Sequence, residues 1–324
     1  MYLHSIKKCF LFFILYFCNQ IQSVLVQSEK LTCNNFNGGA KEFYFFYNVH
    51  KRPHLLDDSK QLSIMKSIFD EREQLEKSRL HILLEQPPSV VKIFDRTPAV
   101  TTDLADCIKK MRNTTVENAE IRCVASAATF LFNPEIDPFE IFPRVVFDTA
   151  QKECVVDDVT VADLISEYCD YKKQIEQFRN NTIPLKVRQV IDKEVDSLEK
   201  EYKALENEIK IQKLELSENL LAIAKRLKEV ERSRLFTLVI NTFGHLFELH
   251  LFKRMIELDV SKIALIAGAL HTIFVKQMLE EAGARALIFH TSGFDLSCNN
   301  VVPLEPKYLD IFTEPAWYER CTVL

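Results

Sequence analysis

Apolar residues recur along this chain with two different periods, and segments of one period follow segments of the other. Short apolar runs of strand length occupy four places: residues 41–49, 80–84, 261–267 and 284–289. Apolar residues at helical spacing fill the stretch after the first run, residues 58–78, and the stretch after the third, residues 272–282. A strand, a helix and a second strand in this order predict a βαβ unit with parallel strands. We therefore expect an α/β fold with a mostly parallel sheet flanked by helices.

The middle of the chain shows a different pattern. Residues 121–132 are almost continuously apolar and predict another strand. Residues 161–178 predict a helix, and residues 186–232 predict one long charged helix whose apolar positions shift phase once, as in a coiled coil with a stutter. Together they predict a long helical hairpin or arm, inserted at about residues 161–232. This arm is expected either to fold as a lid or brace within its own chain, or to bind a second copy or another partner helix.

Ionisable residues stand directly behind three of the predicted strands. His50 follows the first strand, Glu85 follows the second, and His271 stands close behind the third, which ends at Gly268. Gly268 is expected to let the backbone turn sharply off its strand. Open α/β folds bind their ligands at the carboxyl ends of parallel strands. We therefore expect His50 and Glu85 at the same edge of neighbouring strands, with His271 beside them.

Two histidines and a carboxylate are suitable ligands for a divalent metal ion such as manganese, cobalt or zinc. So few protein ligands leave positions open for water and substrate, and a metal ion would lower the pKa of the bound water. Glu85 is expected to be either a ligand or the general base, and the sequence does not distinguish these roles. Three further residues are expected to orient the imidazoles by hydrogen bonds: Asn48, Thr272 and His290.

A further histidine and carboxylate, His245 and Glu248, have the spacing of a metal-binding pair on one helix face. They lie in a strongly apolar segment of the chain. Packing in the core is therefore the expected role of both residues.

The order of these motifs resembles the TraB/GumN family, which includes the Tiki proteases and is related to the erythromycin esterase and ChaN folds. His50 matches the first motif histidine, Glu85 the motif glutamate, and Gly268 with His271 the second Gly-x-x-His motif. The resemblance covers about residues 41–88 and 240–290. It implies a single α/β domain and metal-dependent hydrolysis of peptide bonds.

Two positions depart from the family pattern. Tyr47 stands where the first Gly-x-x-His motif has its glycine, and the Arg-Asn pair that often precedes the second motif is replaced at best by Arg254 or Arg122. These departures affect catalysis more than fold, because a fold does not by itself specify a function. The alternative function is therefore a catalytically degraded binding or structural protein that uses its helical arm to contact a partner.

Composition limits the remaining function classes. With 324 residues, 47% of them hydrophobic and 27% charged, the chain can form one sizeable core, and we expect a single domain over residues 33–324. A formal net charge of −5 without a basic patch excludes a nucleic-acid-binding protein. A haem or small-ligand binder of the ChaN kind is a third possibility, for which the sequence shows no axial-ligand signature.

The amino terminus predicts export. Lys7 and Lys8 precede an apolar run at residues 9–18, so residues 1–28 are expected to be a signal peptide or an uncleaved membrane anchor. The protein would then be periplasmic or secreted, or anchored to a membrane. Two of its nine cysteines lie in the leader, and the odd number of seven leaves at least one unpaired in a monomer. The leader thus predicts export, and the resemblance to the TraB/GumN family implies that the exported protein is a metal-dependent hydrolase acting on peptides.

Overall fold

A computed structural model describes residues 22–36, 39–51, 58–75, 78–85, 89–91, 100–139, 141, 146–149, 153–291, 304–305 and 312. Its strands are β1 (Gln22–Phe36), β2 (Gly39–Lys51), β3 (Leu80–Leu84), β4 (Ser89–Val91), β5 (Thr114–Asn118), β6 (Val146–Asp148), β7 (Glu153–Val155), β8 (Lys262–Gly268) and β9 (Arg285–Thr291). Its helices are α2 (Asp58–Leu75), α3 (Val100–Ile108), α4 (Cys123–Phe132), α5 (Val161–Arg179), α6 (Leu185–Ile211), α7 (Leu220–Arg226), α8 (Glu229–Glu257) and α9 (Ala269–Glu281).

The main sheet has six strands in the order β5-β3-β8-β2-β1-β9. The first four are parallel, whereas β1 is antiparallel to both β2 and β9. The prediction of a mostly parallel sheet flanked by helices is therefore confirmed. β8 lies between β2 and β3, so the two strands of the first βαβ unit are not the neighbours that we expected. This order places the strand that leads to His271 next to both of them.

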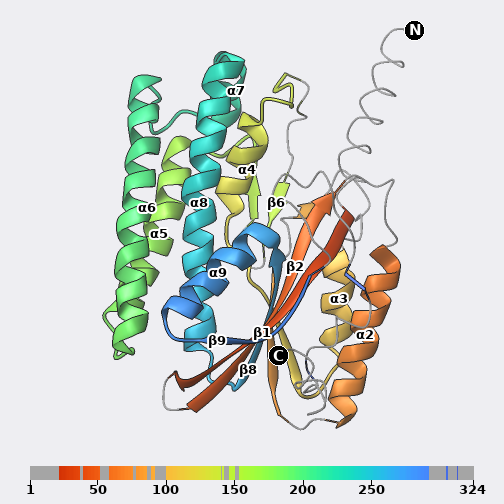
Figure 1. Ribbon diagram of the computed structural model, residues 1–324. Coiled ribbons are helices and arrows are strands. Elements are labelled where there is room, and N and C mark those ends of the chain that lie inside the picture. Colours follow the sequence, from red (N-terminus) through yellow and green to blue (C-terminus); the bar gives the residue numbers. More distant parts are fainter. Residues whose placement is uncertain are drawn as a thin grey trace, which may run out of the picture.

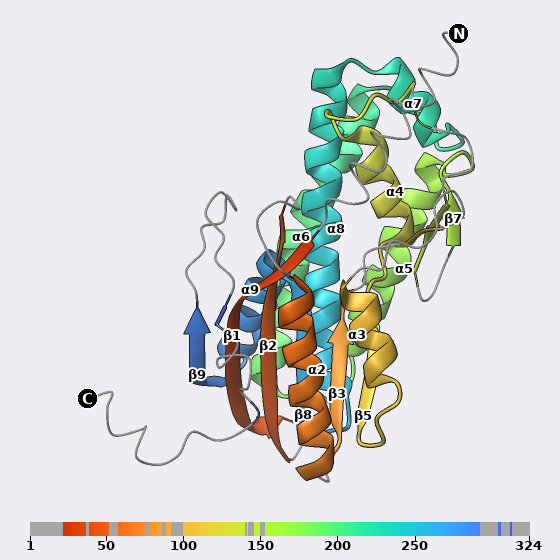
Figure 2. The same cartoon turned by 90° about the vertical axis from the view of Figure 1, so that its right-hand side faces the viewer.

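Helices cover both faces of this sheet, as expected for strands that are buried on both sides (Figures 1 and 2). Along β2 the side chains alternate between the two faces. Tyr44 and Phe46 pack in a core with α2 and α3, whereas Phe45 and Tyr47 belong to the larger core that includes α4 to α9. One strand thus contributes to two separate hydrophobic layers.

Most of residues 121–132 form the helix α4 (Cys123–Phe132) and not the predicted strand. Alanine residues at positions 125, 127 and 128 favour a helix, and they are buried together with Val124 and Leu131. A short helix that is buried on most sides shows no clear period, so its sequence resembles that of a buried strand. This ambiguity explains the wrong prediction.

The single long helix expected at residues 186–232 is also wrong, because the structure divides it among α6, α7 and the start of α8. α6 ends at Ile211, and Lys213 then adopts a left-handed φ of 52°. Asn219 begins α7 by accepting hydrogen bonds from the backbone N–H groups of Leu221 and Ala222. The shift in the apolar pattern therefore marks a helix end and a turn, and not a stutter.

α5 and α6 pack beside α8 of the same chain (Figure 1). Tyr168 of α5 stacks on Tyr202 of α6 with ring centroids 3.7 Å apart, and Leu198 and Leu205 of α6 are buried. Those two leucines belong to the apolar stripe from which a dimer was predicted. The homodimer stays a prediction, but any interface must use other residues.

α8 is the one helix within the described ranges that is long and apolar enough to cross a membrane. Buried residues make up 67% of its most apolar stretch, which is what a core helix requires. At the other end of the chain, β1 begins at Gln22, inside the stretch predicted as a leader. Residues 1–21 of that predicted leader lie outside the described residues.

Candidate functional site

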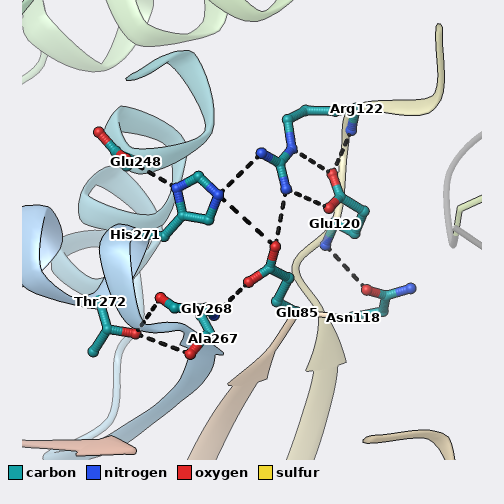
Figure 3. Close-up of polar contacts among 9 residues, drawn as sticks. All are labelled: Glu85, Asn118, Glu120, Arg122, Glu248, Ala267, Gly268, His271 and Thr272. Carbon is teal, nitrogen blue, oxygen red and sulfur yellow. Dashed lines mark hydrogen bonds and ion pairs between the residues drawn. The ribbon is translucent and has the colours of Figure 1, made fainter. Parts of the chain in front are cut away.

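Three adjacent parallel strands end at one edge of the sheet, and each is followed by an ionisable residue. Glu85 follows β3, Glu120 and Arg122 follow β5, and His271 lies in the first turn of α9 behind β8. Glu248 of α8 completes the group (Figure 3). We refer to Glu85, Glu120, Arg122, Glu248 and His271 as the edge cluster. The prediction that ligand-type residues gather at this carboxyl edge is therefore supported for Glu85 and His271.

Glu85 connects two strand ends. Its Oε2 accepts a hydrogen bond from the backbone N–H of Gly268 at 2.6 Å, and its Oε1 lies 3.0 Å from the Arg122 guanidinium. Gly268 has a φ of −51°, which other residues adopt equally well. A Cβ at this position would lie 3.3 Å from Glu85 Oε2 and 3.7 Å from His271 Cδ2. The glycine therefore leaves room for the close approach of Glu85, and its φ does not require glycine for the sharp turn that we expected.

Arg122 is the cation of the edge cluster. Its Nε and one terminal nitrogen donate to the two oxygens of Glu120 at 2.9 and 2.7 Å, and its Cζ lies 4.0 Å from the ring centroid of Phe247. Burial alone would lower the pKa of this guanidinium, but Glu120 and Glu85 outweigh burial and raise the pKa above its ordinary value. Arg122 therefore carries a permanent positive charge, held in place by two carboxylates and an aromatic ring.

The partners of His271 determine which of its nitrogens carries the proton. The terminal nitrogen Nη1 of Arg122 lies 3.2 Å from His271 Nε2, and an arginine can only donate. Nε2 must therefore accept with its lone pair. Nδ1 then carries the hydrogen and donates it to Oε1 of Glu248 at 2.9 Å. The result is a neutral imidazole, oriented by a carboxylate, whose basic nitrogen faces Arg122 and Glu85.

The edge cluster is mostly but not fully shielded from solvent. The exposed fraction of the side chain is 12% for Glu85, 10% for Glu248 and 20% for His271. Burial raises the pKa of Glu248 above its ordinary value, although the hydrogen bond from His271 opposes this shift. The Phe247 ring meets the imidazole of His271 edge to face, at a centroid distance of 5.1 Å. His271 thus packs against Phe247 and keeps a fifth of its side chain exposed to solvent.

The other predicted residues occupy different places. Thr272 donates its hydroxyl to the carbonyls of Ala267 and Gly268, so it fastens the strand–helix junction behind His271. Asn48 is buried in β2, in register with Gly268, and its Oδ1 has no hydrogen-bond partner among the described residues. His290 lies on β9, three strands from β8, or about 14 Å at ordinary strand spacing.

His50 lies on β2, paired with Ser23 of β1, two residues beyond the register pair Asn48 and Gly268. Its backbone is thus near the same sheet edge, whereas its side chain lies outside what the structure describes. The predicted metal set can therefore be assessed only for Glu85 and His271.

The described donors do not form a metal site as they lie. Within the described ranges, no three histidine, cysteine or acidic side chains are placed to hold one ion. His271 Nε2 and Glu85 Oε1 are 3.9 Å apart, whereas two ligands at about 2.1 Å from one ion would be roughly 3.0–3.4 Å apart. Arg122 donates to both atoms and so holds the position that an ion would need.

Sequence reasoning did not find three members of the edge cluster. Glu120 and Arg122 follow β5, whose sequence TTVEN is too short and polar to indicate a buried strand. The sequence therefore indicated Arg122 only as a possible substitute for the missing Arg-Asn pair. Glu248 was paired with His245 by spacing. In the structure His245 contacts Glu194 and Glu201 of α6 at 3.1 Å each, while Glu248 contacts His271.

Tyr47 has a defined role at the position of the motif glycine. Its hydroxyl donates to Glu29 Oε2 at 2.9 Å, and Glu29 Oε1 forms an ion pair with Lys276 of α9 at 3.0 Å. Tyr47 and Glu29 are both almost completely buried. This chain of contacts joins β2 and β1 to the helix that carries His271. Tyr47 thus helps to position α9, the helix of the second motif.

Comparisons of the chain with protein-family models, with curated proteins and with solved structures gave no match.

Proposed function

We propose that this chain is a hydrolase that activates water at His271. The observation that supports this proposal is the tautomer of His271. Its Nδ1–H is held by Glu248, which leaves the lone pair of Nε2 pointing toward Arg122 and Glu85 at the sheet edge. A histidine oriented by a carboxylate in this way is suited to act as a general base.

A water molecule between His271 and Arg122 would require the two side chains to separate, because Nη1 and Nε2 are 3.2 Å apart and a bridging water needs about 2.8 Å to each nitrogen. Nη1 of Arg122 donates to His271, while Nε and Nη2 are held by Glu120. The guanidinium is planar, so Nη1 cannot move alone while Glu120 holds the other two nitrogens, and the imidazole of His271 would have to shift away from it. Nη1 would then donate to the water oxygen, and the water would donate its own hydrogen to Nε2. His271 would accept this proton as the water oxygen attacks a carbonyl carbon, and Glu248 would stabilise the resulting imidazolium. The imidazolium would then return the proton to the leaving amine nitrogen as the C–N bond breaks.

Arg122 and Glu85 would have different duties in this reaction. The guanidinium would stabilise the negative charge that develops on the carbonyl oxygen. Glu85, fixed by the N–H of Gly268, would keep Arg122 aligned. The resemblance to the TraB/GumN family supplies the proposed substrate class, which is a peptide, and the apolar amino terminus supports export.

A metal-dependent form of this hydrolase is the second candidate, and the charge of the edge cluster favours it. The edge cluster holds three carboxylates and one guanidinium: Glu85 and Glu120 pair with Arg122, and Glu248 contacts His271. A divalent ion would compensate this excess of negative charge. It would require Arg122 to leave His271 Nε2 and the His50 imidazole to contribute.

A catalytically degraded binding protein is the remaining alternative. It is favoured by the fact that Arg122 donates to the nitrogen that should act as base or ligand. In that case the edge cluster would be a structural ion network, and the helical surface of α5 and α6 would be the functional region.

The test uses the purified full chain and a broad peptide library, assayed with and without a chelator, together with elemental analysis. We expect hydrolysis that is lost in His271→Ala, kept in His245→Gln and insensitive to the chelator. His245 is a suitable control because it also contacts carboxylates, but on α6. Chelator-sensitive hydrolysis with bound metal would favour the metal-dependent form. If the protein shows neither bound metal nor hydrolysis, the binding-protein alternative is supported.

A further inference from the structure

Two cysteine thiols, those of Cys123 and Cys154, meet directly beside the edge cluster. Their sulfur atoms are 3.1 Å apart, although the residues are 31 positions apart in the chain. The Cys123 thiol also lies 3.3 Å from the carbonyl of Phe147, and the Cys154 thiol lies 3.4 Å from the carbonyl of Cys123. Both residues are buried, with exposed fractions of 0% and 8%. Little movement separates this contact from an S–S bond of about 2.05 Å.

The contact joins the small sheet to the helix that follows Arg122. Cys154 lies on β7, and β4, β6 and β7 form a separate three-stranded sheet. Cys123 is the first residue of α4, immediately after Arg122. At its other side the small sheet begins with β4, shortly after Glu85 in sequence. The small sheet is therefore linked to Glu85 through the chain and to Arg122 through the two thiols.

We propose that Cys123 and Cys154 form an intramolecular disulfide that holds Arg122 in the edge cluster. A covalent link at Cys123 would restrict the start of α4, and with it the backbone of the preceding residue. Arg122 would then be kept within reach of Glu85, Glu120 and His271. Formation of the disulfide does not depend on the proposed hydrolase, whereas its effect on hydrolysis does.

The reaction needs an oxidant, which a low-molecular-weight disulfide such as oxidised glutathione supplies. The Cys154 thiolate, being the less buried of the two, attacks the glutathione disulfide and releases one glutathione thiolate. The Cys123 thiolate then attacks the sulfur of Cys154 in the mixed disulfide and releases the second glutathione. The pair loses two electrons and two protons, which reduce one oxidised glutathione to two thiols. If the protein is exported, the oxidising environment outside the cytoplasm would provide comparable oxidants.

The experiment treats the purified full chain with mixtures of reduced and oxidised glutathione, blocks the remaining thiols with an alkylating agent, and maps non-reduced peptides by mass spectrometry. We expect a Cys123–Cys154 linked peptide in oxidising mixtures, and its absence in Cys154→Ser. Cys107→Ser and Cys169→Ser are matched controls, because neither residue is buried and neither contributes to the thiol contact. The thermal midpoint should rise on oxidation in the wild type and in both controls, but not in Cys154→Ser.

The outcomes separate the two proposals. Alkylation of both Cys123 and Cys154 in every oxidising mixture, or linkage of either to a different cysteine, would overturn the disulfide whatever the activity. A mapped Cys123–Cys154 link in a protein without hydrolytic activity would support the disulfide and count against the proposed function. Where hydrolysis is present, reduction should lower its rate in the wild type, and Cys154→Ser should show the lower rate in both redox states.

Discussion

Replacement of Glu248 by glutamine tests the site most directly, because the change keeps the shape of the side chain and removes its charge. Glu248 accepts the Nδ1 hydrogen of His271 at 2.9 Å, and its side chain is only 10% exposed. A glutamine amide oxygen can still accept this hydrogen, so the tautomer is retained. What is lost is the charge that would stabilise the imidazolium formed during water attack.

The expected loss of activity follows from the strength of the contact. A hydrogen bond to a charged group contributes about 1.5–3 kcal/mol. At about 1.4 kcal/mol for each factor of ten in rate, Glu248→Gln should lower kcat/KM by roughly 10- to 150-fold. The folded state of Glu248→Gln should nevertheless be at least as stable as that of the wild type. Burial raises the pKa of Glu248, which means that the ionised form destabilises the folded state above the ordinary pKa of glutamate, and a neutral glutamine avoids this cost.

The assay compares peptide hydrolysis and thermal midpoint at neutral pH for the wild type, Glu248→Gln and the control Glu201→Gln. Glu201 contacts another carboxylate-bound histidine, His245, so the control removes the same type of contact away from the site. We expect Glu248→Gln to be slow and at least as stable as the wild type. The control should be active and less stable. Activity of Glu248→Gln within twofold of the wild type would refute the role of Glu248. A lower thermal midpoint that accounts for the lost activity would also count against it.

Three further predictions concern stability. Burial would lower the pKa of His245, but nearby carboxylates outweigh burial and raise it. The stability that protonated His245 contributes should therefore be complete below about pH 6.5 and lost as the pH rises through the raised pKa. Thermal midpoints of the wild type and His245→Gln, measured against pH, should converge in alkaline buffer. Lys41 donates to the carbonyls of Ile256 and Leu258 at the end of α8 at 2.8 and 2.6 Å, so Lys41→Met should cost about 1–3 kcal/mol in urea unfolding. Leu198→Lys should unfold the protein and not merely change its mass in solution, because Leu198 is fully buried; a folded monomer would instead support a dimer interface.

The sequence predicted the elements that carry a clear local pattern. The strands and helices around β2, α2, β3, β8 and α9 follow from apolar runs of strand length and from helical spacing, and the structure contains them within a few residues. The βαβ rule makes β2 and β3 parallel, so it predicted that His50 and Glu85 share the carboxyl edge of the sheet. His271 joins them only because β8 pairs with β3 in the same sheet, which the local pattern suggested but could not establish.

The rest of the site depends on contacts between segments far apart in the chain. β8 lies between β2 and β3 in the sheet, and β5 pairs with β3 despite its polar sequence. α8 places Glu248 in contact with His271. Local patterns say which face of an element is apolar, but not which partner covers it. Similarly, the apolar shift after α6 is compatible with a stutter or a turn, and only packing against α8 distinguishes them. Glu120, Arg122 and Glu248 therefore became visible as site residues only in the folded chain, since their chemistry arises from neighbours that the sequence does not place beside them.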